Sequence, residues 1–318
     1  MYKLIRFYNQ NRKKIFKIIL IIVFIIGIIQ LLNYFTRVNK EQQVNQNTTI
    51  TEEDNISQEL VSNKSAISGE NVSSAKLKKD TDVINKFVEY CNQSDLNSAY
   101  DLLTNECKEE MFPTIEDFSN IYYSKIFSGD KKTYTIENWS GSVYQVRFTG
   151  DILSTGNLSN SETKQDYITI VKENGENKLN INNYIGRNNL NKTTEYNDIK
   201  ITVTRIDTYM DYEIYSLSIE NNSENDILLD TSDDTKSVYL LDSKNMKYYF
   251  YGNEIVKNRL IIESKFTNTL QIKFSNSYST SRNIKNLVFS KLVLNYDEYN
   301  NLENKDEYND FYQFRVDV

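Results

Sequence analysis

The chain has 318 residues, of which 39% are hydrophobic and 25% are charged, and its formal net charge is −7. It contains no His and two Cys, which excludes Ser-His-Asp and Cys-His catalytic groups, His-ligated metals, Cys₄ metal centres and multi-disulfide scaffolds. The negative charge also argues against a broad nucleic-acid-binding face.

The amino-terminal segment has the pattern of a membrane anchor. Twelve consecutive apolar residues run from Ile18 to Ile29, and apolar residues continue to Phe35. A helix over residues 18–35 rises about 27 Å, close to the roughly 30 Å of bilayer hydrocarbon. Six basic residues and no acidic residue precede this run. We therefore expect a transmembrane signal anchor over residues 15–35, residues 1–14 in the cytoplasm, and the main domains outside the plasma membrane.

Two other interpretations fit this segment less well. A cleaved signal peptide needs small residues at its cleavage site, and residues 33–38 offer no such pair. A buried core helix would rarely carry six basic residues on one flank only. The chain beyond the six basic residues has a net charge of −13, so anionic lipid would repel it.

A polar segment follows the apolar run. Residues 36–78 contain no aromatic residue and no Pro, and they are rich in Asn, Gln, Ser, Thr, Glu and Lys. Such a composition cannot bury enough apolar surface to offset the entropy lost on ordering the chain. We predict a disordered stalk over residues 36–78.

Helical periodicity begins near Asp80. Asp80 or Thr81 is placed to cap a first helix, a second helix runs from Leu96 to Cys107, and Pro113 opens a third. A period of two follows, in the pairs Tyr134/Ile136, Tyr144/Val146, Ile168/Ile170 and Leu179/Ile181. This order predicts an α+β domain over residues 79–190, with three helices followed by an antiparallel sheet.

The segment FVEYCNQSDLNSAYDLLTNE has the hydrophobic spacing of a known superfamily. It resembles the opening helices of bacterial exported members of the nuclear transport factor 2-like (cystatin-like cone) superfamily. The matching positions are Phe87, Cys91, Ala99, Tyr100, Leu102 and Leu103. The resemblance covers residues 79–190, and it implies a pocket between the helices and a curved sheet.

The period of two continues through residues 191–318, as seven or eight short strands separated by turns. This pattern predicts a β-sandwich. The runs YSLSIENNSENDILLD and VYLLDSKNMKYYF resemble the immunoglobulin-like domain of Gram-positive surface proteins, at Asn222, Leu241, Asp242 and Tyr248. The predicted fold class is an α+β cone-type domain followed by an all-β immunoglobulin-like sandwich, preceded by one transmembrane helix.

Aromatic residues of the α+β domain are the candidates for a pocket. Acid–base chemistry in such a pocket needs a carboxylate with a pKa near neutral, beside a Tyr or a His. No acidic residue occupies an expected inward position, because Asp166 flanks a strand start. The alternative is that the aromatic side chains simply fill the core. The candidate pocket-lining residues are Tyr122, Trp139, Tyr144 and Tyr184.

Three further groups have a structural and a functional interpretation. Cys91 and Cys107 lie about 18 Å apart by helical rise, which favours two buried free thiols over a disulfide. The acidic residues of one loop could bind Ca²⁺ but lack the order of a dedicated calcium loop, which favours a solvated loop; they are Glu224, Asp226, Asp230, Asp233 and Asp234. The carboxyl-terminal aromatics form either an edge strand or a partner-binding strip; they are Tyr308, Phe311, Tyr312 and Phe314.

These features favour a non-enzymatic, membrane-anchored binding or scaffolding protein of a Gram-positive cell envelope. We expect no catalytic residue, metal, cofactor or nucleic acid, and we expect the membrane, other envelope proteins or further copies of the chain as partners. Single-span proteins with an exported cone-type domain resemble components of conjugative secretion assemblies, although those carry a second cone domain. The alternative is a small-molecule-binding protein or an acid–base enzyme that uses the cone pocket.

Overall fold

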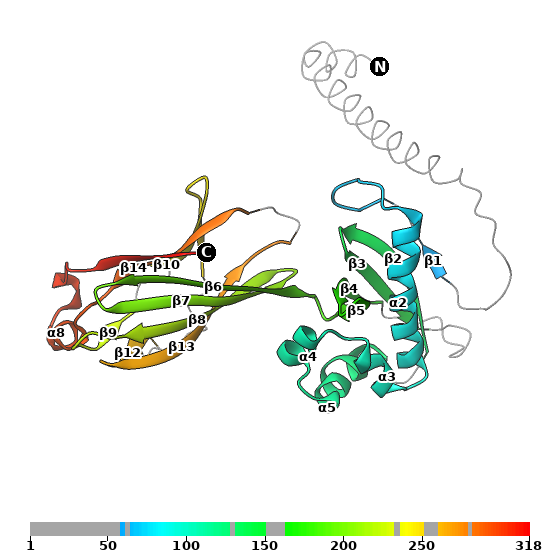
Figure 1. Cartoon of the computed structure of the whole chain (residues 1–318), viewed down its shortest axis with the longest axis horizontal. Helices are drawn as coiled ribbons and strands as arrows, with labels where there is room; N and C mark the ends of the chain where they lie inside the picture. The colour runs from blue at the N-terminus through cyan, green and yellow to red at the C-terminus, as the bar shows by residue number, and fades with distance from the viewer. Residues whose placement is uncertain are drawn as a thin grey trace, which may run out of the picture. The chain divides into compact units, whose positions relative to one another are not determined.

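A computed structural model describes residues 58–60, 64–127, 131–150, 163–231, 236–250, 260–278 and 282–318 (Figure 1). The chain divides into two units, residues 1–55 and residues 56–318, and every described residue belongs to the second. The expected cytoplasmic tail, the anchor over residues 15–35 and most of the stalk lie outside the described residues. Within the described ranges, no helix is long and apolar enough to span a bilayer.

The first part of the described chain, residues 58–181, is a helix–sheet region. Its helical elements are α2 (Ser74–Asn92), α3 (Leu96–Asp101), α4 (Asn105–Met111), α5 (Ile115–Phe118), the π-helical η1 (Ser119–Tyr123) and α6 (Ser124–Ile126). Its strands are β1 (Gln58–Leu60), β2 (Lys132–Ser140), β3 (Val143–Gly150), β4 (Lys164–Glu173) and β5 (Glu176–Asn180). They form one sheet in the order β1-β2-β3-β4-β5, antiparallel except for β1. The predicted order of helices followed by an antiparallel sheet is confirmed.

The helices cover one face of this sheet, and α2 crosses it (Figure 1). Apolar side chains of the helices share one core with the inward residues of β2 to β5. At its centre four aromatic rings lie with centroids 5.7–6.2 Å apart, those of Phe87, Phe112, Phe118 and Tyr122. Aromatic side chains therefore fill this part of the interior.

The first helix starts earlier than the sequence pattern predicts. Helix α2 begins at Ser74, and the Ser73 side chain caps it by accepting a hydrogen bond from the Lys76 N–H. Asp80 and Thr81 lie inside the helix and are buried, so the prediction that one of them is the cap is wrong. The predicted stalk boundary at residue 78 falls within α2.

The predicted second helix is two short helices. A break at Leu102–Thr104 separates α3 from α4, and the Thr104 hydroxyl caps α4 by accepting from the Cys107 N–H at 3.0 Å. The break brings the Thr104 N–H to 3.0 Å from the Leu179 carbonyl oxygen of β5. Bonding to the sheet therefore replaces the continuous helix.

Part of the expected stalk protects the edge of the sheet. Strand β1 pairs in parallel with β2, and the Ala66 and Ile67 N–H groups donate to the Asn138 and Trp139 carbonyls at 2.8 and 3.1 Å. An open β2 edge would expose a row of unpaired backbone groups. Any polar sequence can supply this backbone pairing, which is why composition did not reveal it.

The second part, residues 184–318, contains two four-stranded antiparallel sheets and a short two-stranded one. One four-stranded sheet has the order β13-β8-β7-β6 and the other the order β11-β10-β14-β15. The strands are β6 (Tyr184–Tyr196), β7 (Ile199–Tyr209), β8 (Tyr212–Asn221), β10 (Val238–Asp242), β11 (Lys247–Tyr249), β13 (Phe266–Ser275), β14 (Ile284–Leu292) and β15 (Tyr312–Asp317). Short strands β9 (Ile227–Leu228) and β12 (Ile261–Ile262) pair with each other, and α8 (Tyr296–Asn301) and the 3-10 turn η3 (Lys305–Glu307) precede β15.

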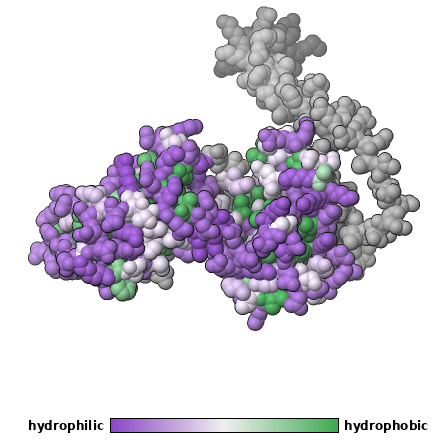
Figure 2. All heavy atoms as spheres, viewed as in Figure 1, coloured by the Kyte–Doolittle hydropathy of each residue, from purple (hydrophilic) through white to green (hydrophobic). Residues whose placement is uncertain are grey.

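Both sheets contribute to one apolar core, with Ile201 and Leu217 from the first and Leu240 and Phe289 from the second. The predicted all-β character is confirmed for these strands, while α8 and η3 were not predicted. The boundary expected between residues 190 and 191 falls within β6. On the face in view, hydrophilic side chains dominate and apolar ones are scattered (Figure 2), so this face offers no broad apolar patch.

Candidate functional site

Three of the four expected pocket residues have the same arrangement. Each tyrosine is buried and donates its hydroxyl to a buried aspartate, which the sequence pattern did not place inside. The hydroxyl–carboxylate distances are 2.8 Å for Tyr122–Asp166, 2.8 Å for Tyr144–Asp80 and 2.9 Å for Tyr184–Asp207. The three tyrosines share one core cluster but pair with three different carboxylates, so they do not converge on one carboxylate.

Asp166 organises the turn between β5 and β6. Besides the Tyr122 hydroxyl, it accepts the N–H groups of Asn182 and Asn183 at 2.9 and 2.8 Å. Both Asn residues have positive φ, 60° and 63°, a conformation that Asn tolerates. Burial raises the pKa of Asp166, while these hydrogen bonds partly oppose the rise. The interpretation that Asp166 lies outside the core is wrong. The missed signal was its position in β4: Asp166 lies two residues before Ile168 and four before Ile170, so all three side chains point to the same face of the strand.

Asp80 joins α2 to the sheet. It accepts the Tyr144 hydroxyl and lies 2.5 Å from the Lys76 ammonium one helical turn earlier. Its second oxygen accepts from the Asn177 side chain at 3.2 Å. Burial raises the pKa of Tyr144, and the neighbouring Asp80 carboxylate raises it further. This carboxylate is therefore partnered on both oxygens.

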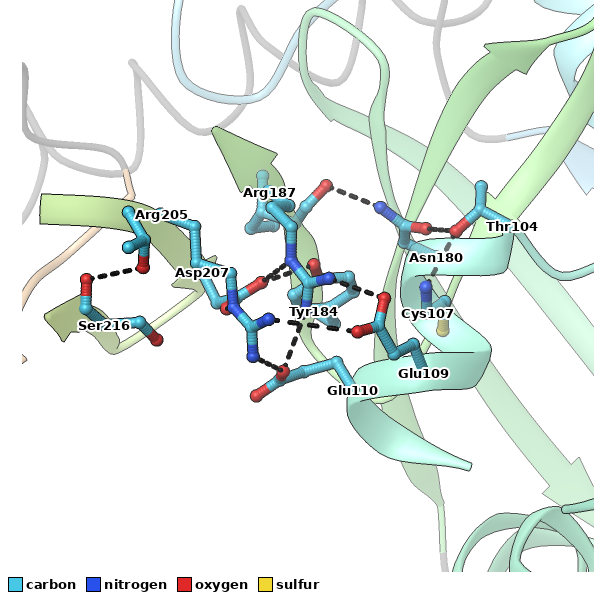
Figure 3. A network of polar contacts seen from close by, with 12 residues as sticks. Thr104, Cys107, Glu109, Glu110, Asn180, Tyr184, Arg187, Arg205, Asp207 and Ser216 are labelled. Carbon is cyan, nitrogen blue, oxygen red and sulfur yellow. Dashed lines mark hydrogen bonds and ion pairs between the residues drawn. The ribbon is translucent and has the colours of Figure 1, made fainter. Parts of the chain in front are cut away.

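Asp207 lies at the centre of a charged cluster that Figure 3 shows from close by. The Arg187 guanidinium, whose side chain is 5% exposed, donates to the fully buried Asp207 at 2.7 Å. Arg205, from the same strand as Asp207, donates to the other oxygen at 3.1 Å. Together with the Tyr184 hydroxyl, three side chains donate hydrogen bonds to Asp207. A buried carboxylate requires such hydrogen-bond and charge partners.

Helix α4 supplies the other acidic members of this cluster. Arg187 donates to Glu109 at 2.8 Å and to Glu110 at 2.9 Å. Glu110 also accepts the Tyr209 hydroxyl at 3.0 Å. Two arginines and three carboxylates thus tie α4 of the helix–sheet region to β6 and β7 (Figure 3). We call these five residues, with Tyr184 and Tyr209, the arginine cluster. Sequence reasoning identified none of its charged members.

Trp139, the fourth expected pocket residue, lies on the other side of the sheet. Its ring packs edge to face on Tyr167, with centroids 5.1 Å apart. Tyr167 alternates with Asp166 and Ile168, whose side chains point towards the helices, so Tyr167 and Trp139 point away from them. The prediction that Trp139 lines an interior pocket with the three tyrosines is therefore wrong.

The remaining predicted groups have ordinary structural positions. Cys91 and Cys107 are buried free thiols, and burial raises the pKa of Cys107 to about 12. In the expected acidic loop, Asp226 accepts the Ser264 N–H at 2.8 Å and Glu224 pairs with Lys265 at 2.7 Å. Asp230 is buried, so the interpretation as a solvated loop is wrong for this residue, and Asp233 and Asp234 lie outside the described residues. The described ranges contain no group of three acidic or cysteine side chains placed to hold a metal.

The carboxyl-terminal aromatics divide between core and surface. Strand β15 is an edge strand paired with β14, which confirms the edge-strand interpretation. Phe314 is 1% exposed and Tyr308 is 9% exposed, so neither can belong to an exposed strip. That part of the prediction is wrong, because these two side chains complete the core. Tyr312 is half-buried and stacks on Tyr196 with ring centroids 4.5 Å apart.

The tyrosine–aspartate pairs bear directly on the acid–base alternative. A catalytic acid or base must reach the proton that it transfers. Here each tyrosine is at most 1% exposed, and each aspartate has further donors from Arg, Lys, Asn or backbone. Such pairs stabilise the fold by satisfying buried polar groups.

Comparisons with known proteins give a weak structural likeness. No protein-family model matches the chain, and no curated protein matches it. Among solved structures, the yjhA protein from Bacillus subtilis is similar over 41% of this chain and 97% of its own length, with 14% identity and a TM-score of 0.28.

Proposed function

We propose that this protein is a membrane-anchored binding or scaffolding protein of a bacterial cell envelope, and that it acts outside the plasma membrane without catalysing a reaction. One observation carries the proposal: the uninterrupted apolar run of residues 18–29 with six basic residues before it and none of the opposite charge. That pattern directs the amino terminus to the cytoplasm and the following chain to the outside.

The buried polar groups support the non-enzymatic part of this proposal. Three buried carboxylates hold elements together: Asp80 links α2 to β3 and β5, Asp166 links η1 to the turn before β6, and Asp207 links β7 to β6. A protein that presents binding surfaces benefits from such rigid internal connections, because a rigid surface loses less conformational entropy when it binds a partner.

The finer description of the fold belongs to the same proposal. The helix–sheet region resembles a nuclear transport factor 2-like domain in its order of elements, and the two-sheet region resembles an immunoglobulin-like sandwich. Within this proposal, a place in a conjugative secretion assembly is one version. In-cell cross-linking distinguishes it: deletion of residues 58–181, the helix–sheet region, removes the partner contacts if that region docks on the assembly, and unchanged contacts argue against it.

Topology is the direct test of the proposal. Protease added to intact protoplasts should digest an epitope placed after Val318 and spare one placed before Lys3. A matched variant replaces Arg12, Lys13, Lys14 and Lys17 with Gln and should lower the fraction of correctly oriented chains. A protected carboxyl-terminal epitope in intact protoplasts, digested only after lysis, would overturn the proposal.

The second candidate, a binding pocket or acid–base enzyme, rests on the buried Tyr122–Asp166 pair. A carboxylate whose pKa burial raises, next to a tyrosine, is the combination that such chemistry uses. A thermal-shift screen of small acids and carbonyl compounds tests it. Stabilisation lost in both Tyr122→Phe and Asp166→Asn would favour this candidate over the first.

A further inference from the structure

The outward face of the sheet β2–β3–β4 carries an aromatic and polar group of side chains that the internal packing does not use. Gln145 alternates with Tyr144 and Val146, which face the helices, so it points outward together with its cross-strand neighbours Glu137 and Tyr167. Arg147, two residues further along β3, lies on the same face and is exposed. We call Glu137, Trp139, Gln145, Arg147 and Tyr167 the outward cluster.

Two rings form a platform in this cluster. Trp139 and Tyr167 are half-buried and meet edge to face at a 68° angle. Val143 and Thr169, which also point outward, are only 1% and 7% exposed, and Gln145 is 5% exposed. Two aromatic rings together with such buried residues are unusual on the sheet face that lies away from the helices, where polar residues normally alternate with core residues.

Planar polar groups continue from the platform in a chain. Gln145 donates its amide N–H to the Tyr167 hydroxyl at 2.9 Å, and its carbonyl oxygen accepts from Arg147. Arg147 also lies 3.7 Å from Glu137, so the two charges cancel. Gln145 is 5% exposed and its amide groups are used within the cluster, so the groups left for a ligand are the Arg147 guanidinium, the Glu137 carboxylate and the Tyr167 hydroxyl. Their formal charges sum to zero, on a chain whose net charge is −7.

Two buried polar atoms of this face have no hydrogen-bond partner among the residues that the structure describes. They are the indole N–H of Trp139 and the hydroxyl of Thr169, and Thr169 is more than nine-tenths buried. An unsatisfied buried polar group is costly, and such a group in a native structure calls for a partner from outside the chain, such as water, an ion or a ligand. A ligand rich in hydroxyl groups supplies partners of both kinds.

From this geometry we infer that the outward cluster binds a neutral glycan chain. This inference rests on the proposed envelope function and adds a ligand class to it. The apolar C–H face of a sugar ring packs on an aromatic ring, while its hydroxyls pair with amide, guanidinium and carboxylate groups. A nucleic acid or an acidic polymer would need an excess of positive charge that the paired Arg147 and Glu137 do not provide. A peptide bound along a sheet edge would need free backbone groups, whereas β2 pairs with β1 and β3.

Trp139 is the only tryptophan of the chain, so its fluorescence reports on this cluster alone. The full chain, purified in a detergent without a sugar headgroup, is titrated with the tetramer of N-acetylglucosamine and with cellotetraose. A saturable change in Trp139 emission with at least one of them is expected. Tyr167→Ala should weaken the binding by about tenfold or more, while Tyr249→Ala, which removes an exposed tyrosine of β11, should leave it unchanged.

The competing outcomes are separated in the same titration. No saturable change with either oligosaccharide, or binding that Tyr167→Ala leaves intact, overturns the inference. Binding of a free peptide in place of the oligosaccharides overturns it in favour of a protein ligand. Circular dichroism of Tyr167→Ala confirms that the variant folds, and Gln145→Ala, which leaves both rings, provides a second test with an expected loss in the same direction. Because the titration uses purified protein, its result stands apart from the protoplast test of topology.

Discussion

The Arg187 guanidinium and the Asp207 carboxylate lie 2.7 Å apart, and both side chains are almost completely shielded from water. Their strands, β6 and β7, belong to the two-sheet region, but Arg187 also binds Glu109 and Glu110 of α4 in the helix–sheet region. A buried ion pair is costly to form and more costly to break, because removal of one partner leaves an uncompensated charge. The arginine cluster is therefore sensitive to the loss of any one of its buried charges.

The first prediction concerns this cluster. Arg187→Ala leaves Asp207 buried with one arginine fewer, and we expect a loss of about 3–5 kcal/mol in the free energy of unfolding. Arg205→Ala is the matched control: its side chain is 29% exposed, so we expect about 1 kcal/mol. Urea unfolding followed by circular dichroism measures both. Equal losses of unfolding free energy in the two variants would show that the burial of Arg187 does not determine the cost of removing it.

The second prediction concerns pH and Asp166. Burial raises the pKa of this carboxyl above its ordinary 3.8, so the folded state holds the proton more tightly than the unfolded state. The sign follows: the contribution of Asp166 to stability is fully present below pH 3.8 and is lost as the pH rises through the higher folded pKa.

Asp166→Asn removes this titration. The free energy of unfolding of the unmodified protein should therefore fall relative to that of Asp166→Asn as the pH rises from about 4 to 7. Asp82→Asn, on the exposed side of α2, is the control for the loss of one carboxylate charge. A difference between the first two proteins that stays constant with pH would contradict the raised pKa.

The third prediction concerns the two thiols. Burial raises the pKa of both Cys91 and Cys107, and a thiol reacts through its thiolate. Ellman's reagent at mildly alkaline pH should label neither cysteine in the native protein at an appreciable rate and both of them in guanidinium chloride. Rapid labelling of the native protein would mean that the core around Tyr122 opens readily. Cys91→Ala and Cys107→Ala assign the reacting thiol in that case.

The sequence predicted those features that depend on side-chain hydrophobicity. Periodicity located the helices after Val83 and the strands of both regions, because burial selects apolar residues at a period of 3.6 or 2. It missed the pairing of residues 58–67 with β2, which uses backbone groups that every residue has. It also missed the break at Thr104, where a bond to β5 outweighs helix continuation.

The candidate site was predicted in part, for a similar reason. The tyrosines were recognisable as buried aromatics, but their carboxylate partners come from distant segments: Tyr122 and Asp166 are 44 residues apart, and Tyr144 and Asp80 are 64 apart. A single sequence gives no signal for such pairs beyond the alternation of inward and outward residues along a strand. That alternation would have placed Asp166 inside, because it lies on the same face of β4 as Ile168 and Ile170.

The fourth prediction concerns the carboxyl-terminal strand. Phe314 fills the core shared by the two sheets, where it is 1% exposed, while Tyr312 two residues earlier is half-buried at the rim. Phe314→Ala should lower the free energy of unfolding by about 3–5 kcal/mol, the cost of a buried cavity of that size. Tyr312→Ala loses the stacked contact with Tyr196, for which we expect about 0.5–1.5 kcal/mol. If β15 instead served mainly as a partner-binding strip, the two variants would be similarly stable and both would lose partner contacts in cells. A large gap in stability between them therefore assigns Phe314 to the core.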